Sequence, residues 1–299
     1  MAVRKLHQDE ADIDERLVRC LVDEQFPRWA GLPLRYVDSH GTQNVLYRLG
    51  DDHVVRLPRI RGAVSDLAHE QRWMPFLARQ LPVPVPEPVA QGRPAHGFPW
   101  TWAVYRWLPG AIPAVGEQEK PEVLGEDLAA FVAALRSVDP AGAPTAYRGG
   151  PLTERDADTR AVLGRIADVI DLDAALAVWD AAMCAPRGPQ PAVWLHGDLQ
   201  PGNVLVDGGR LSAVIDFGCM GLGDPAVDLI AAWYVLDARG RERFRTALAP
   251  DADTWARGRG WALTLAANEL AYYRESNPFM AATATRVIGE LVSAPRERA

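Results

Sequence analysis

The sequence predicts an α+β fold in two parts, a small strand-rich part over residues 1–106 and a larger, mostly helical part over 107–299. Short apolar runs bounded by Gly, Asp and Asn recur before residue 60, as expected for antiparallel strands joined by turns. Proline then occupies every second position from 82 to 88, which favours an extended connector over a helix. Beyond about residue 111, apolar residues recur mainly at helical spacing. These three observations define the fold class.

Local patterns predict the individual elements in order. An amphipathic helix opens the first part, because apolar residues recur every four positions from Ile13 to Leu21. Apolar runs between turn residues predict strands at 34–37, 45–49, 53–58 and 100–107. In the second part, apolar residues at helical spacing predict helices over 122–138 and 159–181.

The composition predicts a soluble cytoplasmic protein. The 299 residues are enough for about two domains, and 48% of them are hydrophobic. The chain has no run of about eighteen apolar residues, and its N-terminus lacks the apolar core of a signal peptide. The three cysteines, Cys20, Cys184 and Cys219, have no paired spacing, so neither a disulfide framework nor a zinc site is expected.

The charge is distributed unevenly along the chain. Residues 1–110 contain 14 Lys+Arg and 13 Asp+Glu, whereas residues 111–299 contain 18 and 26. An acidic second part does not suit a nucleic-acid backbone, which needs a basic surface. It suits attraction of a small cationic substrate, although an ordinary solvated surface would have the same composition.

A polar segment at 193–228 carries the residues expected to do chemistry. Asp198, in His-Gly-Asp, is followed after five residues by Asn203 and after thirteen more by Asp216, in Ile-Asp-Phe-Gly. One carboxylate can orient an attacking hydroxyl, while an amide and a second carboxylate hold Mg²⁺ against nucleotide phosphates. The spacing also matches the catalytic loop and the Asp-Phe-Gly of kinase-type enzymes. Strands at 204–206 and 211–215, joined by a tight turn, would bring Asn203 and Asp216 together.

HGDLQPGN at 196–203, IDFG at 215–218 and GDPAVDL at 223–229 resemble the aminoglycoside phosphotransferase family, from about Leu34 to about Ser293. The resemblance implies a bilobal protein-kinase-like fold, with a nucleotide-clamping lobe over 1–106 and a catalytic and substrate-binding lobe over 107–299. It implies that Asp198 is the catalytic base and that Asn203 and Asp216 are Mg²⁺ ligands. Asp228 would brace the catalytic loop, and Asp224 is expected to cap the helix that carries Asp228.

The predicted nucleotide grip departs from this family pattern. Kinase-like enzymes place a Lys on the third strand, paired with a helix Glu. Only Lys5 and Lys120 occur in this chain, so Arg56 is the candidate on strand 53–58. Its partner would be Glu70, on a helix predicted to start at Ser65. An exposed strand arginine is the alternative, and the exchange leaves the exact phosphate grip open.

Two further segments are expected to contact the nucleotide. The loop with Ser39, Gly41 and Asn44 can lay backbone N–H groups over phosphates, although one glycine is also compatible with a plain hairpin. By resemblance, the backbone of Arg106 and Leu108 would bond the base, and Tyr105 would stand behind it. The bulk of Tyr105 leads us to expect that GTP serves at least as well as ATP.

The acceptor side has the weakest signal. Candidate substrate residues are Trp233, Glu269, Tyr272 and Glu275, because acids on C-terminal helices bind substrate ammonium groups in aminoglycoside kinases. Surface acids and core aromatics would show the same pattern. A protein kinase is disfavoured, since no Ala-Pro-Glu follows the Asp-Phe-Gly and little room remains for an activation loop.

We therefore predict Mg²⁺-dependent transfer of the γ-phosphoryl group of ATP or GTP to a hydroxyl of a small molecule. An aminoglycoside-type antibiotic is the leading acceptor, with antibiotic resistance as the consequence. The alternatives are a macrolide, choline, homoserine or a similar alcohol, or a catalytically inactive nucleotide-binding protein on the same fold. Neither nucleic acid nor membrane is an expected partner, and the sequence carries no signal for an oligomeric state.

Overall fold

The computed structural model describes residues 10–39, 43–188 and 191–293. Contacts divide the chain into two compact units. The first unit comprises residues up to 110 together with 212–218, and the second comprises 111–211 and the residues from 219 onward. The short returning segment 212–218 is notable because it carries Asp216.

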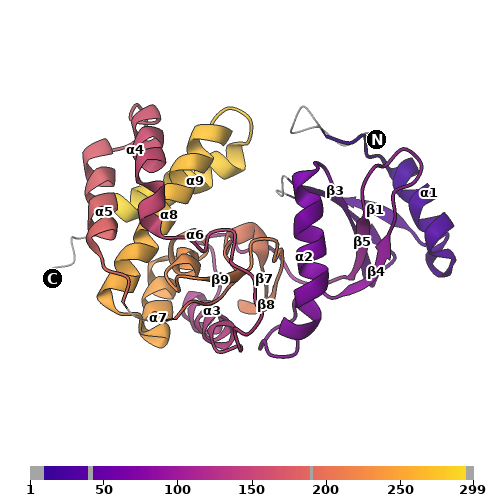
Figure 1. Cartoon of the computed structure of the whole chain (residues 1–299), viewed down its shortest axis with the longest axis horizontal. Helices are drawn as coiled ribbons and strands as arrows, with labels where there is room; N and C mark the ends of the chain where they lie inside the picture. Colours follow the sequence, from indigo (N-terminus) through magenta and orange to yellow (C-terminus); the bar gives the residue numbers. More distant parts are fainter. Residues whose placement is uncertain (1–9, 40–42, 189–190, 294–299) are drawn as a thin grey trace. The chain divides into compact units, whose positions relative to one another are not determined.

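The first unit is built on a five-stranded antiparallel sheet in the order β1-β2-β3-β5-β4. Helix α1 and helix α2 lie on opposite sides of this sheet (Figure 1). The elements are α1 Glu15–Gln25, β1 Leu34–Val37, β2 Asn44–Leu49, β3 His53–Pro58, α2 Gly62–Leu77, β4 Pro88–Gly92 and β5 Trp102–Arg106.

The alternation of side chains along the strands decides what each face of the sheet does. Val55 and Leu57 of β3 are buried in the apolar core that includes Leu21 of α1. The neighbouring positions of β3 and β5 point to the other face, where Tyr105 packs in a cluster with Leu67 of α2. Because successive strand residues face opposite sides, Arg56 lies on the α2 face.

Two details of the first unit differ from the sequence prediction. Strand β4 was not predicted, because its proline-containing start resembles the preceding connector. Gly92, at the end of this strand, lies so close to Trp102 that an added Cβ atom would come within 2.0 Å of the indole. Helix α2 starts at Gly62, three residues before the expected cap, and the Ser65 hydroxyl donates back to Gly62 O at 2.8 Å. Ser65 is therefore a first-turn residue and not the N-cap.

The second unit is mostly helical, with α8 at its centre. Helix α8 packs against α4, α5 and α9, and α3 packs against α7 (Figure 1). The α3–α7 approach depends on small residues, since a Cβ atom on Gly125 would lie 2.3 Å from Gly240 O. The helices are α3 Pro121–Arg136, α4 Asp156–Arg165, α5 Leu172–Cys184, α6 Ala231–Tyr234, α7 Ala238–Leu248, α8 Ala252–Tyr273 and α9 Pro278–Ser293.

The helical spacing predicted over 159–181 belongs to two helices in the structure. Helix α4 ends at Arg165 and α5 begins at Leu172. Asp171 caps the second helix, with its carboxylate accepting from Ala174 N at 3.0 Å. An aspartate with extended backbone satisfies the first free N–H groups of a helix, so it starts a new helix even where apolar spacing continues.

Short strands frame the polar segment. Strand β6, Val193–Leu195, pairs antiparallel with β9, Gly221–Gly223. Strands β7, Val204–Asp207, and β8, Arg210–Val214, form the predicted hairpin. Gly208 and Gly209 between them have φ angles of 54° and 77°, and two consecutive positive φ angles are what a two-residue hairpin turn needs. Among the residues described, no helix is both long and apolar enough to cross a membrane.

Candidate active site

The loop that follows β6 is held by a buried carboxylate. Asp228, in the 3₁₀ helix Val227–Ile230, accepts hydrogen bonds from His196 N at 2.9 Å and Gly197 N at 2.8 Å. Gly197 has a φ of 81°, and a Cβ atom there would lie 2.8 Å from Cys219 O. Burial raises the pKa of Asp228, so its carboxylate depends on these two N–H donors. This is the bracing contact that the resemblance implies.

Asp198, the expected base, is surrounded by donors from three directions. Its Oδ1 accepts from Arg148 Nη1 at 3.1 Å and from Gln200 Nε2 at 3.2 Å. Its Oδ2 accepts from Asn203 Nδ2 at 3.1 Å. Each carboxylate oxygen can accept about two hydrogen bonds. Oδ1 is therefore saturated, and Oδ2 keeps one lone pair for a further donor such as a substrate hydroxyl.

The Asn203 side chain has a defined orientation. Its Nδ2 donates to the backbone oxygen of Asp198 at 2.8 Å and to the Asp198 carboxylate. Because the amide nitrogen faces two acceptors, the amide oxygen is left for another partner. An amide oxygen is a suitable ligand for Mg²⁺, so the donor set around Asn203 fits the predicted metal role.

Arg148 is a site residue that the sequence analysis missed. Its Nη1 donates to Gly197 O at 2.7 Å, to Asp198 Oδ1 and to Cys219 Sγ at 3.3 Å. Burial alone would lower the pKa of Arg148, but Asp198 and Cys219 outweigh it and raise the pKa. Arg148 lies in an irregular stretch without periodicity, and the stretch is held against β9 by the bond from Ala146 N to Leu222 O at 3.0 Å. No sequence pattern could have found it.

Glu269, one of the candidate substrate residues, is brought to the same loop. It is partly buried on α8, and its Oε1 accepts from Gln200 Nε2 at 2.6 Å while its Oε2 accepts from the Tyr234 hydroxyl at 2.7 Å. Burial and the nearby Asp198 raise the pKa of Glu269 to about 7. The two other candidates from this region are exposed: Tyr272 lies in the last turn of α8 with 62% of its surface accessible, and Glu275 lies beyond the helix.

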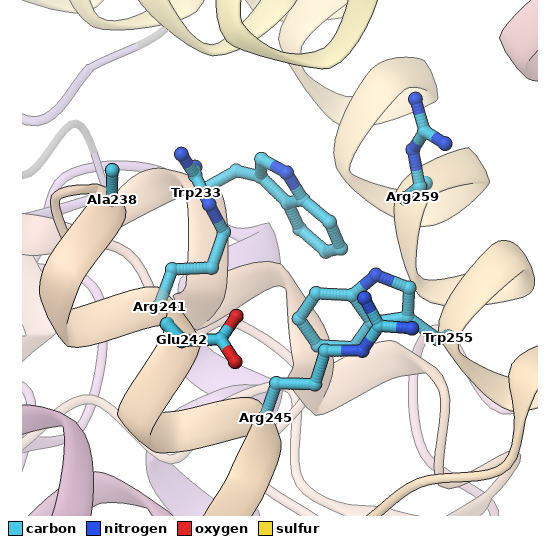
Figure 2. Close-up of a pocket in the computed structure, with 7 residues that line it drawn as sticks. All are labelled: Trp233, Ala238, Arg241, Glu242, Arg245, Trp255 and Arg259. Atoms are coloured by element: carbon cyan, nitrogen blue, oxygen red, sulfur yellow. The ribbon is translucent and has the colours of Figure 1, made fainter. Parts of the chain in front are cut away.

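Trp233, the remaining candidate, lines a different cavity of about 160 Å³ (Figure 2). Its ring lies against Trp255 of α8, with centroids 4.7 Å apart, and the guanidinium of Arg245 stacks on Trp255. Arginines predominate among the other lining residues, which are Arg241, Arg245, Arg259, Ala238 and Glu242. A lining with three guanidinium groups is unfavourable for a cationic ligand.

In the first unit, Arg56 forms the centre of a buried ionic cluster. Its Nη1 donates to Glu70 Oε2 at 2.7 Å and its Nη2 to Asp216 Oδ1 at 3.0 Å. Tyr105 donates its hydroxyl to the same Glu70 oxygen at 3.0 Å. Burial alone would lower the pKa of Arg56, but the Glu70 and Asp216 carboxylates raise it well above its ordinary value. The alternative of an exposed strand arginine is therefore wrong, since Arg56 is buried.

Asp216 is held in an unusual backbone conformation, with a φ of 62°. A non-glycine residue in this region costs on the order of 1–3 kcal/mol and is kept where the surroundings require it. Its side chain is 45% accessible, so one oxygen can bind Arg56 while the carboxylate remains open to solvent. Asn203 belongs to the second unit and Asp216 to the first, and their joint binding of a metal stays a prediction.

The remaining nucleotide candidates have varied surroundings. Gly41 lies outside the described residues, and Ser39 is the last residue before that gap. Asn44 begins β2 and is buried; with its amide oxygen turned toward Arg56, it accepts from Nη2 at 3.1 Å and from Nε at 3.2 Å. The N–H of Arg106 donates to Glu87 O at 3.1 Å, so its carbonyl is the group left for a base, whereas Leu108 follows β5 in an irregular segment.

The family assignment follows from a match over most of the chain. Residues 37–261 match the model of the phosphotransferase enzyme family. The chain belongs to this family. The match includes the Asp198 loop, Asp216 and the Arg56 strand, whereas the acceptor-side candidates Glu269, Tyr272 and Glu275 lie beyond it. No curated protein matches the sequence at a significant level.

Solved phosphotransferase structures share the fold. The GDP complex of wild-type aminoglycoside 2'-phosphotransferase-IIIa superposes with a TM-score of 0.73 at 18% identity, covering 94% of this chain and 99% of the other. The streptomycin–ATP–APH(2")-IIa ternary complex gives 0.61 at 15%, covering 95% and 97%. Macrolide 2'-phosphotransferase MphH from Brachybacterium faecium gives 0.61 at 23%, covering 95% and 100%. These likenesses confirm the predicted kinase-like α+β fold of this phosphotransferase.

Proposed function

We propose that this phosphotransferase transfers the γ-phosphoryl group of ATP or GTP to a hydroxyl group of a small molecule, in the cytoplasm and with Mg²⁺. The observation that carries the proposal is the state of Asp198. Its loop is fixed by Asp228, its Oδ1 is saturated, and its Oδ2 has one lone pair left. Such a carboxylate can orient an alcohol and accept its proton.

The chemistry can be written with each group in place. The acceptor oxygen attacks the γ-phosphorus while the bond to the β-phosphate oxygen breaks, and the nucleoside diphosphate leaves. The acceptor proton passes to Asp198 Oδ2. Asn203 and Asp216 would hold Mg²⁺, which neutralises charge on the phosphates when bound. Arg56, supported by Glu70 and Asn44, would contact phosphate oxygens, with Ser39 and Gly41 in the covering loop.

An aminoglycoside-type antibiotic is the proposed acceptor, and resistance by O-phosphorylation is the proposed consequence. The two aminoglycoside-related structures above, one of them holding streptomycin, support this choice, as does the acidic second part of the chain. A macrolide is the second candidate, because macrolide 2'-phosphotransferase MphH covers the chain equally well. Tyr272 and Glu275 are the side chains proposed to face the acceptor, since both carboxylate oxygens of Glu269 accept hydrogen bonds within the protein.

The test is a phosphoryl-transfer screen. Purified enzyme with Mg²⁺ and either ATP or GTP is offered aminoglycosides, macrolides and amino alcohols, and nucleoside diphosphate release is followed together with the acceptor mass. A gain of one phosphate by an acceptor supports the proposal and identifies the class. Binding of nucleotide without transfer to any acceptor, and without hydrolysis, would instead favour the inactive nucleotide-binding alternative. Asp198→Ala is the matched control for adventitious kinase activity.

A further inference from the structure

A continuous set of hydrogen bonds links helix α8 to the candidate base. Gln200 Nε2 donates one hydrogen bond to Asp198 Oδ1 at 3.2 Å and another to Glu269 Oε1 at 2.6 Å. Tyr234 is the last member of this network, and its hydroxyl donates to Glu269 Oε2 at 2.7 Å. All four residues belong to the second unit, so this hydrogen-bond network lies within one compact unit of the protein.

This hydrogen-bond network depends on the orientation of the Gln200 side-chain amide. A carboxamide has two N–H donors on one atom and an acceptor on the other, and rotation by half a turn exchanges them. Both acceptors that Nε2 meets are carboxylate oxygens, so the nitrogen must face them. If Glu269 were absent, one donor would lose its partner and the amide could present its oxygen to Asp198, where two oxygens would repel each other.

We propose that Glu269 is a positioning residue for the Asp198 carboxylate, acting through the side-chain amide of Gln200. Asp198 Oδ1 is then held by Arg148 and by a Gln200 amide of fixed orientation, which leaves Oδ2 directed at the acceptor. The inference rests on the proposed function, because it gives Asp198 the role of the base. It differs from direct binding of an acceptor ammonium group by Glu269, which would need the negative charge itself.

The two roles predict different effects of substituting Glu269. In Glu269→Gln the new amide oxygen can accept from Gln200, and its Nε2 can donate to the Tyr234 hydroxyl, which is able to accept as well as donate. The positioning contact survives although the charge is lost. In Glu269→Leu neither contact survives. A positioning role therefore tolerates Gln and fails with Leu even when water is the acceptor. A cation-binding role leaves hydrolysis unchanged in both variants and lowers only the turnover of a cationic acceptor.

The experiment measures hydrolysis of ATP and GTP with Mg²⁺, where water is the acceptor and no cationic substrate is present. We expect Glu269→Leu and Gln200→Leu each to lower kcat by about 10-fold, because small misplacements of a reacting group cost up to about 10²-fold. KM for the nucleotide should stay within about 2-fold, since the phosphates are held elsewhere. Glu269→Gln should keep wild-type kcat. The double variant Glu269→Leu/Gln200→Leu should lose no more than either single variant.

Two controls separate the possible failures. Asp253→Ala removes an exposed acid from the first turn of the same helix and should leave kcat unchanged. Asp198→Ala sets the floor of the assay. Wild-type kcat in both Leu variants, or additive losses in the double variant, would overturn the positioning role while leaving the proposed base intact. Full hydrolysis by Asp198→Ala would overturn the proposed base and the positioning role together. Thermal unfolding of each variant confirms that it is folded, and Gln200→Leu carries the test if Glu269→Leu is not.

Discussion

The Asp228 carboxylate accepts the backbone N–H of Gly197 at 2.8 Å, and this bond fixes the residue immediately before Asp198. A second bond from His196 N uses the other carboxylate oxygen, so both oxygens of a fully buried acid serve the same loop. The orientation of Asp198 is therefore determined by backbone contacts as well as by its own side-chain partners.

Replacing Asp228 by Ala should destabilise the protein and disable the loop together. Two buried N–H groups would lose their acceptors, at about 1–3 kcal/mol for each unsatisfied group. Asp228→Asn keeps one acceptor oxygen and should fall between Ala and wild type. Urea unfolding gives the free energies, and a stability equal to wild type in Asp228→Ala would show that other groups satisfy the loop.

Removing the candidate base should affect turnover far more than nucleotide binding. We expect Asp198→Ala to lower kcat by about 10²–10⁴-fold, with little change in nucleotide affinity, because a positioned base acts in the transition state. Steady-state kinetics and calorimetric titration of the nucleotide measure the two quantities. Turnover near that of wild type would contradict the assignment.

The Arg56 cluster should respond unequally to changes in its members. Arg56→Lys keeps a positive charge beside Glu70 and should retain partial activity, whereas Arg56→Ala leaves Glu70 buried without a cation and should lose most activity and stability. Loss of one partner from a buried ion pair costs about 3–5 kcal/mol. The double variant Arg56→Met/Glu70→Leu, which buries no charge, should recover stability but not activity. Thermal unfolding and kinetics on the three variants separate these effects.

The titration of Glu269 predicts a pH-dependent stability difference. Its pKa is raised to about 7 in the folded protein, so the fold favours the protonated form. The cost of this shift is absent below the unfolded pKa of about 4.5, grows as the pH rises, and is complete above pH 7, with an upper limit of about 3 kcal/mol. The stability advantage of Glu269→Gln over wild type should therefore grow as the pH rises from about 4.5 to about 7. Unfolding free energies at pH 5 and 8 measure the gain, with Glu275→Gln as an exposed control.

Tyr105 provides a test of nucleotide choice. The side chain is buried beside Glu70, and we expect its bulk to disfavour adenine, so that GTP serves at least as well as ATP. Tyr105→Ala should raise kcat/KM for ATP relative to GTP by the equivalent of about 1–3 kcal/mol. Tyr105→Phe removes the hydroxyl donor to Glu70 but keeps the ring, so it should leave the nucleotide ratio unchanged. An unchanged ratio of kcat/KM for ATP to that for GTP in Tyr105→Ala would show that the ring does not restrict the choice of base.

The sequence predicted those features that depend on local signals. The strand at 53–58 and the pairing of Arg56 with Glu70 were predicted from the sequence, and the two glycines at 208 and 209 marked the hairpin turn. The contacts of Arg148 could not be predicted in this way, because they join three segments that are far apart in the chain. The bond between Gln200 and Glu269 could not be predicted either, because the two residues are 69 positions apart in the sequence.

The returning segment 212–218 has a consequence for how the protein is made. Arg56 is synthesised early, but its partner Asp216 emerges from the ribosome 160 residues later. During that interval Glu70 is the carboxylate available to Arg56 from this cluster, and the first unit lacks one of its own segments. Domains commonly fold as they are made, from the N-terminus onward. Here the N-terminal unit is completed only after residues 111–211 of the helical unit have been translated, which couples the maturation of the two.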